Sequence, residues 1–121
     1  MEITIYHNPR CSKSRQTLEI VDQHAQARGM QVNVIEYLKT PPNHQQLDSI
    51  LRGLNMEPRD LMRKKEAEYS DNNLANETLS RDQLIAAMID NPKVIERPIV
   101  VVGDDVVIGR PPEAVNAILP E

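Results

Sequence analysis

The sequence predicts a single α/β domain over residues 1–121, because strand and helix patterns follow each other in one characteristic order. Three observations lead to this prediction. A strand–helix–strand unit opens the chain, helical patterns fill its middle, and a hairpin of two apolar strands followed by a short helix closes it. This order, β-α-β … β-β-α, is that of a thioredoxin- or glutaredoxin-like core with a helical insert at approximately residues 43–90.

The opening unit is predicted from its two periodicities. Residues 2–6 alternate and contain β-branched side chains, which predicts a strand. Residues 12–28 have a helical pattern, and Gly29 is a plausible stop. The apolar residues on one face of this helix are Leu18, Val21 and Ala25. Residues 31–37 predict a second strand, parallel to the first because a crossover helix joins them.

The middle of the chain is predicted to be helical. Residues 43–53 carry apolar side chains at helical spacing, behind an asparagine that can cap the helix. Pro58 can begin another short helix. The stretch 64–79 is polar with little periodicity, so we expect a solvated surface segment there. Ser80 and Gln83 form a capping-box pattern that predicts a further helix.

The end of the chain is predicted to return to the sheet. Residues 98–102 are an apolar strand with a proline at the first position, where proline is tolerated. Residues 103–105, Gly-Asp-Asp, are a turn signal, and residues 106–108 predict the returning strand of a hairpin. A final short helix is expected over residues 111–119.

Composition excludes several classes of function. A net charge of −4 gives no general electrostatic reason to bind nucleic acid. The sequence has neither a signal-peptide pattern nor a run of about 20 apolar residues, so we expect no membrane association. One cysteine cannot form an internal disulfide, and a reduced, cytoplasmic location is expected. One cysteine and three scattered histidines offer no metal-ligand spacing, and no glycine-rich loop is present, so no bound metal or cofactor is expected.

The single cysteine is the strongest candidate for chemistry. Cys11 follows the first predicted strand and a turn, and a helix is predicted to begin directly after it. A helix N-terminus favours negative charge, so the pKa of the thiol should be lowered. His7 lies four residues upstream across the turn and could reach the sulfur. The alternative, a small buried cysteine, is less consistent with the polar and cationic residues around it.

The residues around this cysteine indicate how it would be used. In thioredoxin-like oxidoreductases a second cysteine usually follows three positions later, but here that position is Ser14. An oxidised Cys11 must therefore be resolved by an external thiol. Arg97 precedes Pro98, a candidate cis-proline, in the loop expected to pack beside the cysteine. Two further arginines, Arg63 and Arg110, complete a set whose guanidinium forks match oxyanions.

These residues together resemble the glutaredoxin-dependent arsenate reductase family. The motifs that carry the resemblance are His7-Asn8-Pro9-x-Cys11-x-x-Ser14-Arg15, Leu61-Met62-Arg63-Lys64, Ile95-Glu96-Arg97-Pro98-Ile99-Val100-Val101 and Arg110-Pro111-Pro112-Glu113. The resemblance covers essentially the whole chain. It implies an oxidoreductase with a thioredoxin-like fold and a role in arsenical resistance.

The resemblance also implies roles for individual residues. Cys11 would be the nucleophile that attacks arsenic, and His7 would help to lower its pKa. Arg63, Arg97 and Arg110 would bind arsenate and then the arsenite product. The backbone amides from Ser12 to Arg15 would complete an anion cradle. Glutathione would be the co-substrate, and a glutaredoxin would be the protein partner that delivers electrons.

Two further residues near the anion cradle are candidates for substrate binding. Two other functions are alternatives to arsenate reduction. Ser14 and Arg15 are expected to support substrate binding, although a capping serine and a surface arginine would look the same. The Spx-type regulators use a similar fold to bind RNA polymerase, but they usually carry Cys-x-x-Cys, from which Ser14 departs. A glutathione-dependent thiol reductase with another substrate would carry the same motifs.

Overall fold

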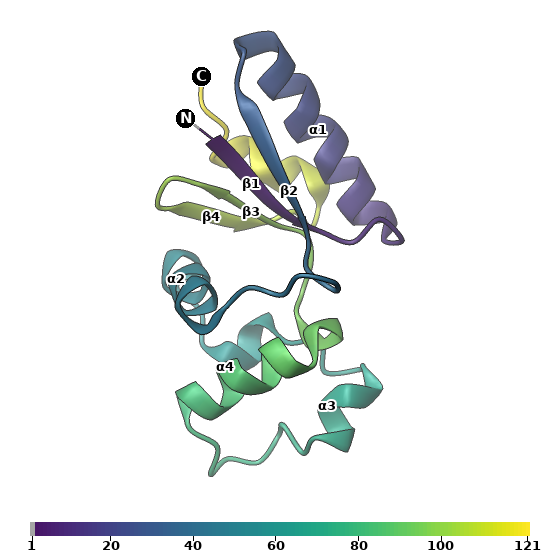
Figure 1. The fold of residues 1–121 in the computed structure, drawn as a ribbon, viewed down its shortest axis with the longest axis vertical. Helices are drawn as coiled ribbons and strands as arrows, with labels where there is room; N and C mark the ends of the chain where they lie inside the picture. Colours follow the sequence, from purple (N-terminus) through teal and green to yellow (C-terminus); the bar gives the residue numbers. More distant parts are fainter. Residues whose placement is uncertain (1) are drawn as a thin grey trace. The chain divides into compact units, whose positions relative to one another are not determined.

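Residues 2–121 are described by a computed structural model in which the chain divides into two units (Figure 1). The sheet unit consists of the segments that end at Thr40 and start again at Arg97, and the helical unit runs from Pro41 to Glu96. The helical unit occupies the part of the chain where the sequence predicts an insert at approximately residues 43–90. Within residues 2–121, no helix combines the length and the apolar character needed to cross a bilayer.

The sheet unit has the predicted order of elements. Their bounds are β1 Glu2–His7, α1 Ser12–Arg28, β2 Gln31–Glu36, β3 Ile99–Val102, β4 Asp105–Ile108 and the 3₁₀ helix η3 Pro112–Ala117. The strands are ordered β2-β1-β3-β4. β1 and β2 are parallel, as the crossover helix predicts, whereas β3 is antiparallel to both β1 and β4. Gly29 ends α1 in the left-handed conformation with φ of 64°, which confirms the predicted stop.

The core of the sheet unit is aliphatic and lies between the sheet and the two helices α1 and η3 (Figure 1). Its buried members come from β1, α1, β3, η3 and the residues that follow η3: Ile3, Ile5, Val21, Ala25, Val100, Val102, Val115 and Leu119. Burial of these side chains from water is the main force that holds α1 against the sheet. The position of the first residues of α1, where the cysteine lies, is therefore fixed by the packing of its later turns.

The second half of the sheet unit differs from the prediction in several details, the first being that β3 begins at Ile99 rather than at residue 98. β4 begins at Asp105 rather than at residue 106, because Gly103 with φ of 62° closes the hairpin in fewer residues. The final helix is a 3₁₀ helix. The Arg97–Pro98 peptide bond is cis, as expected for that candidate, and the Arg110–Pro111 bond is also cis, which was not predicted.

The helical unit is built from short helices with well-defined starts. Their bounds are α2 His44–Leu54, η1 Pro58–Leu61, α3 Ala67–Asp71, α4 Arg81–Asp90 and η2 Pro92–Val94. Asn43 and Ser80 each cap the following helix with a full capping box, which confirms both predicted starts. The buried apolar face of α2 and α4 is formed by Leu47, Ile50, Leu51, Leu84, Ile85 and Met88.

The prediction of a solvated surface stretch at residues 64–79 was wrong in part. The segment contains α3, and Leu74 within it is only 2% exposed. The Leu74 backbone N–H donates to the Tyr69 carbonyl, and the Leu74 carbonyl accepts from Arg59 Nε. α3 has only five residues, too few to show periodicity, and Leu74 is a single buried leucine in the turns that follow it, so neither gave a signal in the sequence.

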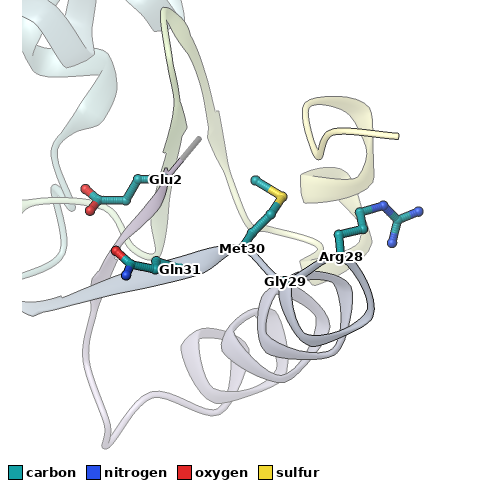
Figure 2. A pocket seen from close by; sticks show the side chains of 5 residues that line it. All are labelled: Glu2, Arg28, Gly29, Met30 and Gln31. Atoms are coloured by element: carbon teal, nitrogen blue, oxygen red, sulfur yellow. The ribbon is translucent and has the colours of Figure 1, made fainter.

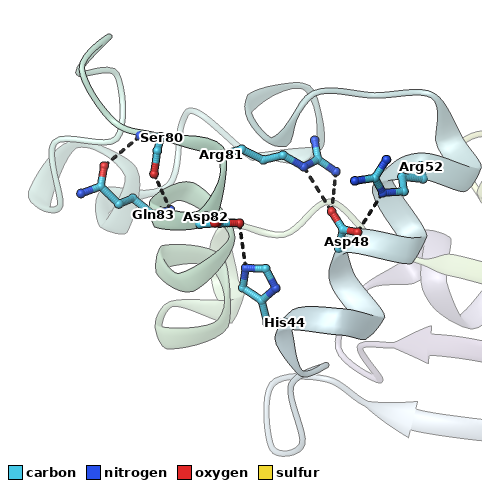
Figure 3. A network of polar contacts seen from close by, with 7 residues as sticks. All are labelled: His44, Asp48, Arg52, Ser80, Arg81, Asp82 and Gln83. Carbon is cyan, nitrogen blue, oxygen red and sulfur yellow. Dashed lines mark hydrogen bonds and ion pairs between the residues drawn. The ribbon is translucent and has the colours of Figure 1, made fainter.

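A polar network joins α2 and α4 on the surface of the helical unit (Figure 3). Asp48 accepts hydrogen bonds from Arg52 at 2.8 Å and from Arg81 at 2.9 Å. Arg52 and then Arg81 hold the pKa of the Asp48 carboxyl below its usual range. His44 lies 3.2 Å from an Asp82 oxygen. Exposed ion pairs of this kind contribute little to the free energy of unfolding. We therefore expect the network to align the two helices rather than to stabilise the fold.

Candidate active site

Cys11 occupies the N-cap position of α1, which confirms the predicted placement of the thiol at a helix start. Its backbone is extended, with φ of −95° and ψ of 122°. The Cys11 N–H donates to the Asn8 carbonyl at 3.0 Å, which closes the turn after β1. The sulfur is therefore carried at the dipole end of α1 on a hydrogen-bonded turn, and it is half-buried.

The surroundings of the sulfur favour the thiolate. Partial burial raises the pKa of Cys11, but the Ser14 N–H, the Arg97 guanidinium and the Lys13 N–H outweigh it, and the net pKa lies below its usual value. Arg97 acts both through a hydrogen bond and through its charge. Arg110 Nη1 lies 3.8 Å from the sulfur. Two backbone amides and two guanidinium groups thus converge on one sulfur, which is the arrangement expected for a nucleophile that meets an anion.

His7 contacts Ser14 rather than the sulfur. Its Nδ1 lies 2.6 Å from Ser14 Oγ, and the Asn8 N–H donates to the same oxygen at 3.0 Å. The Ser14 proton is then available to His7 Nδ1, which fits a neutral ring protonated at Nε2. The prediction that His7 could reach the sulfur directly is corrected in this respect: the imidazole lies against the residue whose N–H contacts the sulfur.

Burial, opposed by Glu36 and assisted by the charge of Arg15, lowers the pKa of His7. The unfolded chain, with an ordinary pKa near 6.5, therefore binds more protons than the folded chain just below that pH. We expect the free energy of unfolding of the wild type to fall as the pH falls through this range. The free energy of unfolding of a His7→Gln variant should fall less over the same range. Urea denaturation between about pH 7.5 and 5 measures it.

The control for this experiment is His44→Gln, which removes an exposed imidazole from the helical unit and should leave the contribution of His7 in place. Identical pH dependence in the wild type and in His7→Gln would contradict the neutral, buried state of the His7 ring.

Arg97 and Arg110, two arginines of the sheet unit, are both brought to Cys11, as the sequence predicts. Besides its approach to the sulfur, Arg110 Nη1 donates to the Arg97 carbonyl at 3.4 Å, so the two arginine loops touch. Arg15 has a different contact: its Nη1 donates to the Pro9 carbonyl at 2.9 Å and braces the turn that carries Cys11. Its predicted contact with substrate stays a prediction.

Arg63 lies in the helical unit and is held by two carboxylates. Its Nη1 donates to Glu96 Oε1 at 3.2 Å, and its Nε lies 3.4 Å from Glu66 Oε1. Glu96 directly precedes Arg97 in the sequence. The predicted part of Arg63 in oxyanion binding stays a prediction.

Three residues of the site, Asn8, Thr17 and Gly109, were not predicted from the sequence. Asn8 accepts the Arg10 N–H on its side chain at 3.0 Å and so rigidifies the turn, a role that the Asn-Pro pair could have indicated. Thr17 is fully buried in the second turn of α1, and Gly109 is buried against it. Their proximity depends on a contact between residues 92 positions apart, which no local pattern reveals.

Gly109 has no room for a side chain. A Cβ atom there would lie 2.6 Å from Thr17 Oγ1 and 2.9 Å from Pro98 Cγ. We expect Gly109→Ala to lower the free energy of unfolding by about 1–3 kcal/mol, because the surroundings must shift. The displacement of Pro98 should also move Arg97 and so raise the pKa of the Cys11 thiol. Urea denaturation and the pH dependence of iodoacetamide alkylation measure the two effects.

Gly103→Ala is the matched control, because a Cβ atom at that position meets nothing within 4 Å. It should strain the hairpin, whose φ there is 62°, but leave the thiol pKa unchanged. A normal thiol profile in Gly109→Ala would show that the glycine does not position the loop that carries Arg97.

A surface pocket of about 400 Å³ lies elsewhere in the sheet unit (Figure 2). It is lined by Glu2, Arg28, Gly29, Met30 and Gln31. These residues lie at the start of β1, at the end of α1 and at the start of β2, whereas Cys11 follows the other end of β1, so the pocket is separate from the candidate site. Among residues 2–121, no group of three or more His, Cys, Asp or Glu side chains could hold a metal ion.

The chain is similar in sequence to a known protein family and to several bacterial proteins. A family model described as the ArsC family matches residues 6–118. The chain is 48% identical over 119 residues to the Escherichia coli strain K12 protein YfgD, which is named an uncharacterized protein, with 98% of this chain and 97% of the relative covered. It is 40% identical over 119 residues to a Neisseria meningitidis protein named arsenate reductase, with 98% of each chain covered.

A solved structure gives the same result for the fold. The structure titled arsenate reductase from Vibrio cholerae superposes with a TM-score of 0.88 at 46% sequence identity, and the match covers 98% of each chain. This likeness confirms the predicted α/β fold of the thioredoxin-like class.

Proposed function

The chain belongs to the ArsC family, and on this premise we propose that it is an arsenate reductase in which the Cys11 thiolate attacks arsenate. The observation that carries the proposal is the convergence of the Ser14 and Lys13 N–H groups and the Arg97 and Arg110 guanidinium groups on one sulfur. Such a site both stabilises the thiolate and attracts a tetrahedral oxyanion. The names of the relatives in Neisseria meningitidis and Vibrio cholerae support arsenate as that oxyanion.

In the first step the Cys11 thiolate forms a sulfur–arsenic bond. One arsenic–oxygen bond breaks, and the departing oxygen takes up protons and leaves as water, so arsenic stays pentavalent. Arg97 and Arg110 neutralise the anion, which removes the repulsion between thiolate and arsenate and stabilises the charge that develops on the oxygens. The helix N-terminus provides further N–H donors for those oxygens.

The later steps need thiols from outside, because the chain has one cysteine. Glutathione forms a second sulfur–arsenic bond and displaces a second water. A glutaredoxin thiolate then attacks the glutathione sulfur, the electron pair of that sulfur–arsenic bond passes to arsenic, and a mixed disulfide forms. Water cleaves the remaining bond to Cys11 and releases arsenite. One arsenate and two thiols thus give one arsenite, one disulfide and one water.

The remaining predicted residues have supporting parts in this proposal. Ser14 and His7 hold the turn so that the Ser14 N–H meets the sulfur. Arg15 fixes the Pro9 carbonyl and thereby the loop before Cys11. Arg63 is proposed as a third cation for arsenate. A thiol that must return to the reduced state fits a reducing compartment such as the cytoplasm.

A coupled assay tests the proposal. Protein, arsenate, glutathione, glutaredoxin, glutathione reductase and NADPH are mixed, and NADPH oxidation is compared with arsenite formed. We expect equal amounts of both, and loss of both when glutathione or glutaredoxin is left out. No arsenate-dependent oxidation above background, together with rapid turnover of a glutathionylated peptide, would favour a thiol reductase with another substrate instead.

A further inference from the structure

We propose that Thr17 is a positioning residue of this site: its hydroxyl holds the Gly109 carbonyl and thereby places the Arg110 guanidinium beside the Cys11 sulfur. The inference deepens the proposed arsenate reduction and rests on it for the identity of the anion. It does not rest on it for the geometry, which joins Thr17, Gly109 and Arg110 within the sheet unit.

The first step of the argument is the polar character of a buried helix face. The residues of α1 that are buried fall on one stripe: Ser14, Thr17, Val21 and Ala25. The last two belong to the aliphatic core, but the first two are polar, and Thr17 is 0% exposed. A fully buried hydroxyl needs a hydrogen-bond partner, and the partners of Thr17 therefore identify its role.

Thr17 Oγ1 has two carbonyl acceptors and a single proton. It lies 2.8 Å from the Lys13 carbonyl, one helical turn back, and 3.2 Å from the Gly109 carbonyl. The Lys13 carbonyl also accepts the backbone N–H four residues later, as α-helical geometry requires. The Gly109 carbonyl comes from the loop after β4 and has no such helical donor. Loss of the hydroxyl should therefore weaken the hydrogen bonding of the Gly109 carbonyl more than that of the Lys13 carbonyl.

Gly109 is the point where three segments meet. Its carbonyl faces Thr17 of α1, and its N–H donates to the Pro98 carbonyl at 2.9 Å. The space for a Cβ atom is filled by the Thr17 side chain and the Pro98 ring. The helix that carries Cys11 is thus locked at Gly109 to the loops that carry Arg97 and Arg110.

The contacts of Gly109 also determine where the Arg110 guanidinium group lies. Arg110 follows Gly109 in the chain, and its own N–H donates to the Ile108 carbonyl at 2.9 Å, so the backbone on both sides of Gly109 is held. From there Arg110 Nη1 reaches the sulfur at 3.8 Å and the Arg97 carbonyl at 3.4 Å. The side chain itself is exposed, so its direction depends on how its backbone is held.

Thr17→Val is the decisive variant, because valine keeps the shape and removes the hydroxyl. We expect kcat/KM for arsenate to fall by about tenfold to a hundredfold, since a small displacement of a binding group is costly. Thr17→Ser keeps the hydroxyl and should retain most of the activity. Thr4→Val in β1, outside the site, is the matched control, and Thr17→Ala replaces the valine variant if that variant does not fold.

A second readout needs no arsenate turnover. Iodoacetate carries a negative charge and iodoacetamide does not, so the ratio of their alkylation rates at Cys11 reports how well the arginines attract an anion. We expect Thr17→Val to lower this ratio by about threefold, as the loss of one exposed charge contact should. The pH midpoint for iodoacetamide should stay in place, because Arg97 and the Ser14 amide still act on the thiolate.

A double-mutant cycle separates positioning from a purely structural effect. If Thr17 acts through Arg110, Thr17→Val should change the ratio by less than about twofold in an Arg110→Ala background. An equal fall in both backgrounds, or no fall in the wild-type background, would overturn the proposal. A wild-type protein that does not reduce arsenate but shows this cycle would overturn the proposed function and leave the role of Thr17 supported.

Discussion

Replacing Cys11 by serine should abolish arsenate reduction, with kcat lowered by about 10⁴-fold or more. The chain has no second cysteine that could take over the attack, and a serine hydroxyl is not ionised by the N–H groups and guanidinium groups that suffice for a thiol. Because Cys11 is half-buried and serine differs from cysteine only in one atom, the fold should tolerate the change. The coupled NADPH assay and arsenite determination measure the loss.

Gln16→Ala is the control for this variant, since Gln16 is an exposed residue of the same helix. It should keep the wild-type rate. Thermal unfolding of both variants should match that of the wild type, so that the loss is assigned to the sulfur. Arsenate-dependent turnover by Cys11→Ser above about one per cent of the wild-type rate would contradict a covalent mechanism at this residue.

Replacing Arg97 by alanine should have the second largest effect, a fall in kcat/KM of about 10²-fold to 10³-fold. Arg97 lowers the pKa of Cys11 by a hydrogen bond and by its charge, and in the proposed mechanism it also stabilises the anion. Its removal should raise the thiol pKa, so that less thiolate is present at neutral pH. The kcat/KM of Arg97→Lys should lie between those of the wild type and of Arg97→Ala, because a lysine keeps the charge but not the planar fork.

The pH dependence separates the two contributions of Arg97. At a pH above the raised thiol pKa, Arg97→Ala should regain the part of the rate that was lost through protonation, and keep the part that was lost through anion binding. Arg28→Ala at the exposed end of α1 is the matched control and should change neither. Full recovery at high pH would show that Arg97 acts on the thiol alone.

The parts of the fold that depend on local interactions could be predicted from the sequence. Capping boxes at Asn43 and Ser80, the stop at Gly29 and the parallel strands of the opening unit all follow from residues close in the chain. The same is true of Cys11 at its helix start. Each of these features is decided by backbone preferences and periodicity within one or two turns.

The parts that depend on contacts between distant segments could not be predicted in this way. The Thr17–Gly109 contact joins residues 92 positions apart, and glycine before an arginine gives no sign that a threonine will fill the space of its side chain. The sequence places His7 near Cys11 but does not predict its hydrogen bond with Ser14. The rotamer and the burial of the imidazole decide which of the two polar neighbours it contacts, and no local pattern reveals them. Leu74 was missed because it is a single apolar residue in the turns after α3, where no periodic pattern exists.

Detection of a sulfur–arsenic bond at Cys11 tests the central claim most directly. Wild-type protein is incubated with arsenate and glutathione without glutaredoxin, and arsenic is located by intact and peptide mass spectrometry. We expect one arsenic per chain, on the peptide that contains Cys11, and its release as arsenite when glutaredoxin is added. Arsenite formation without arsenic on that peptide, or equal labelling of Cys11→Ser, would contradict the account.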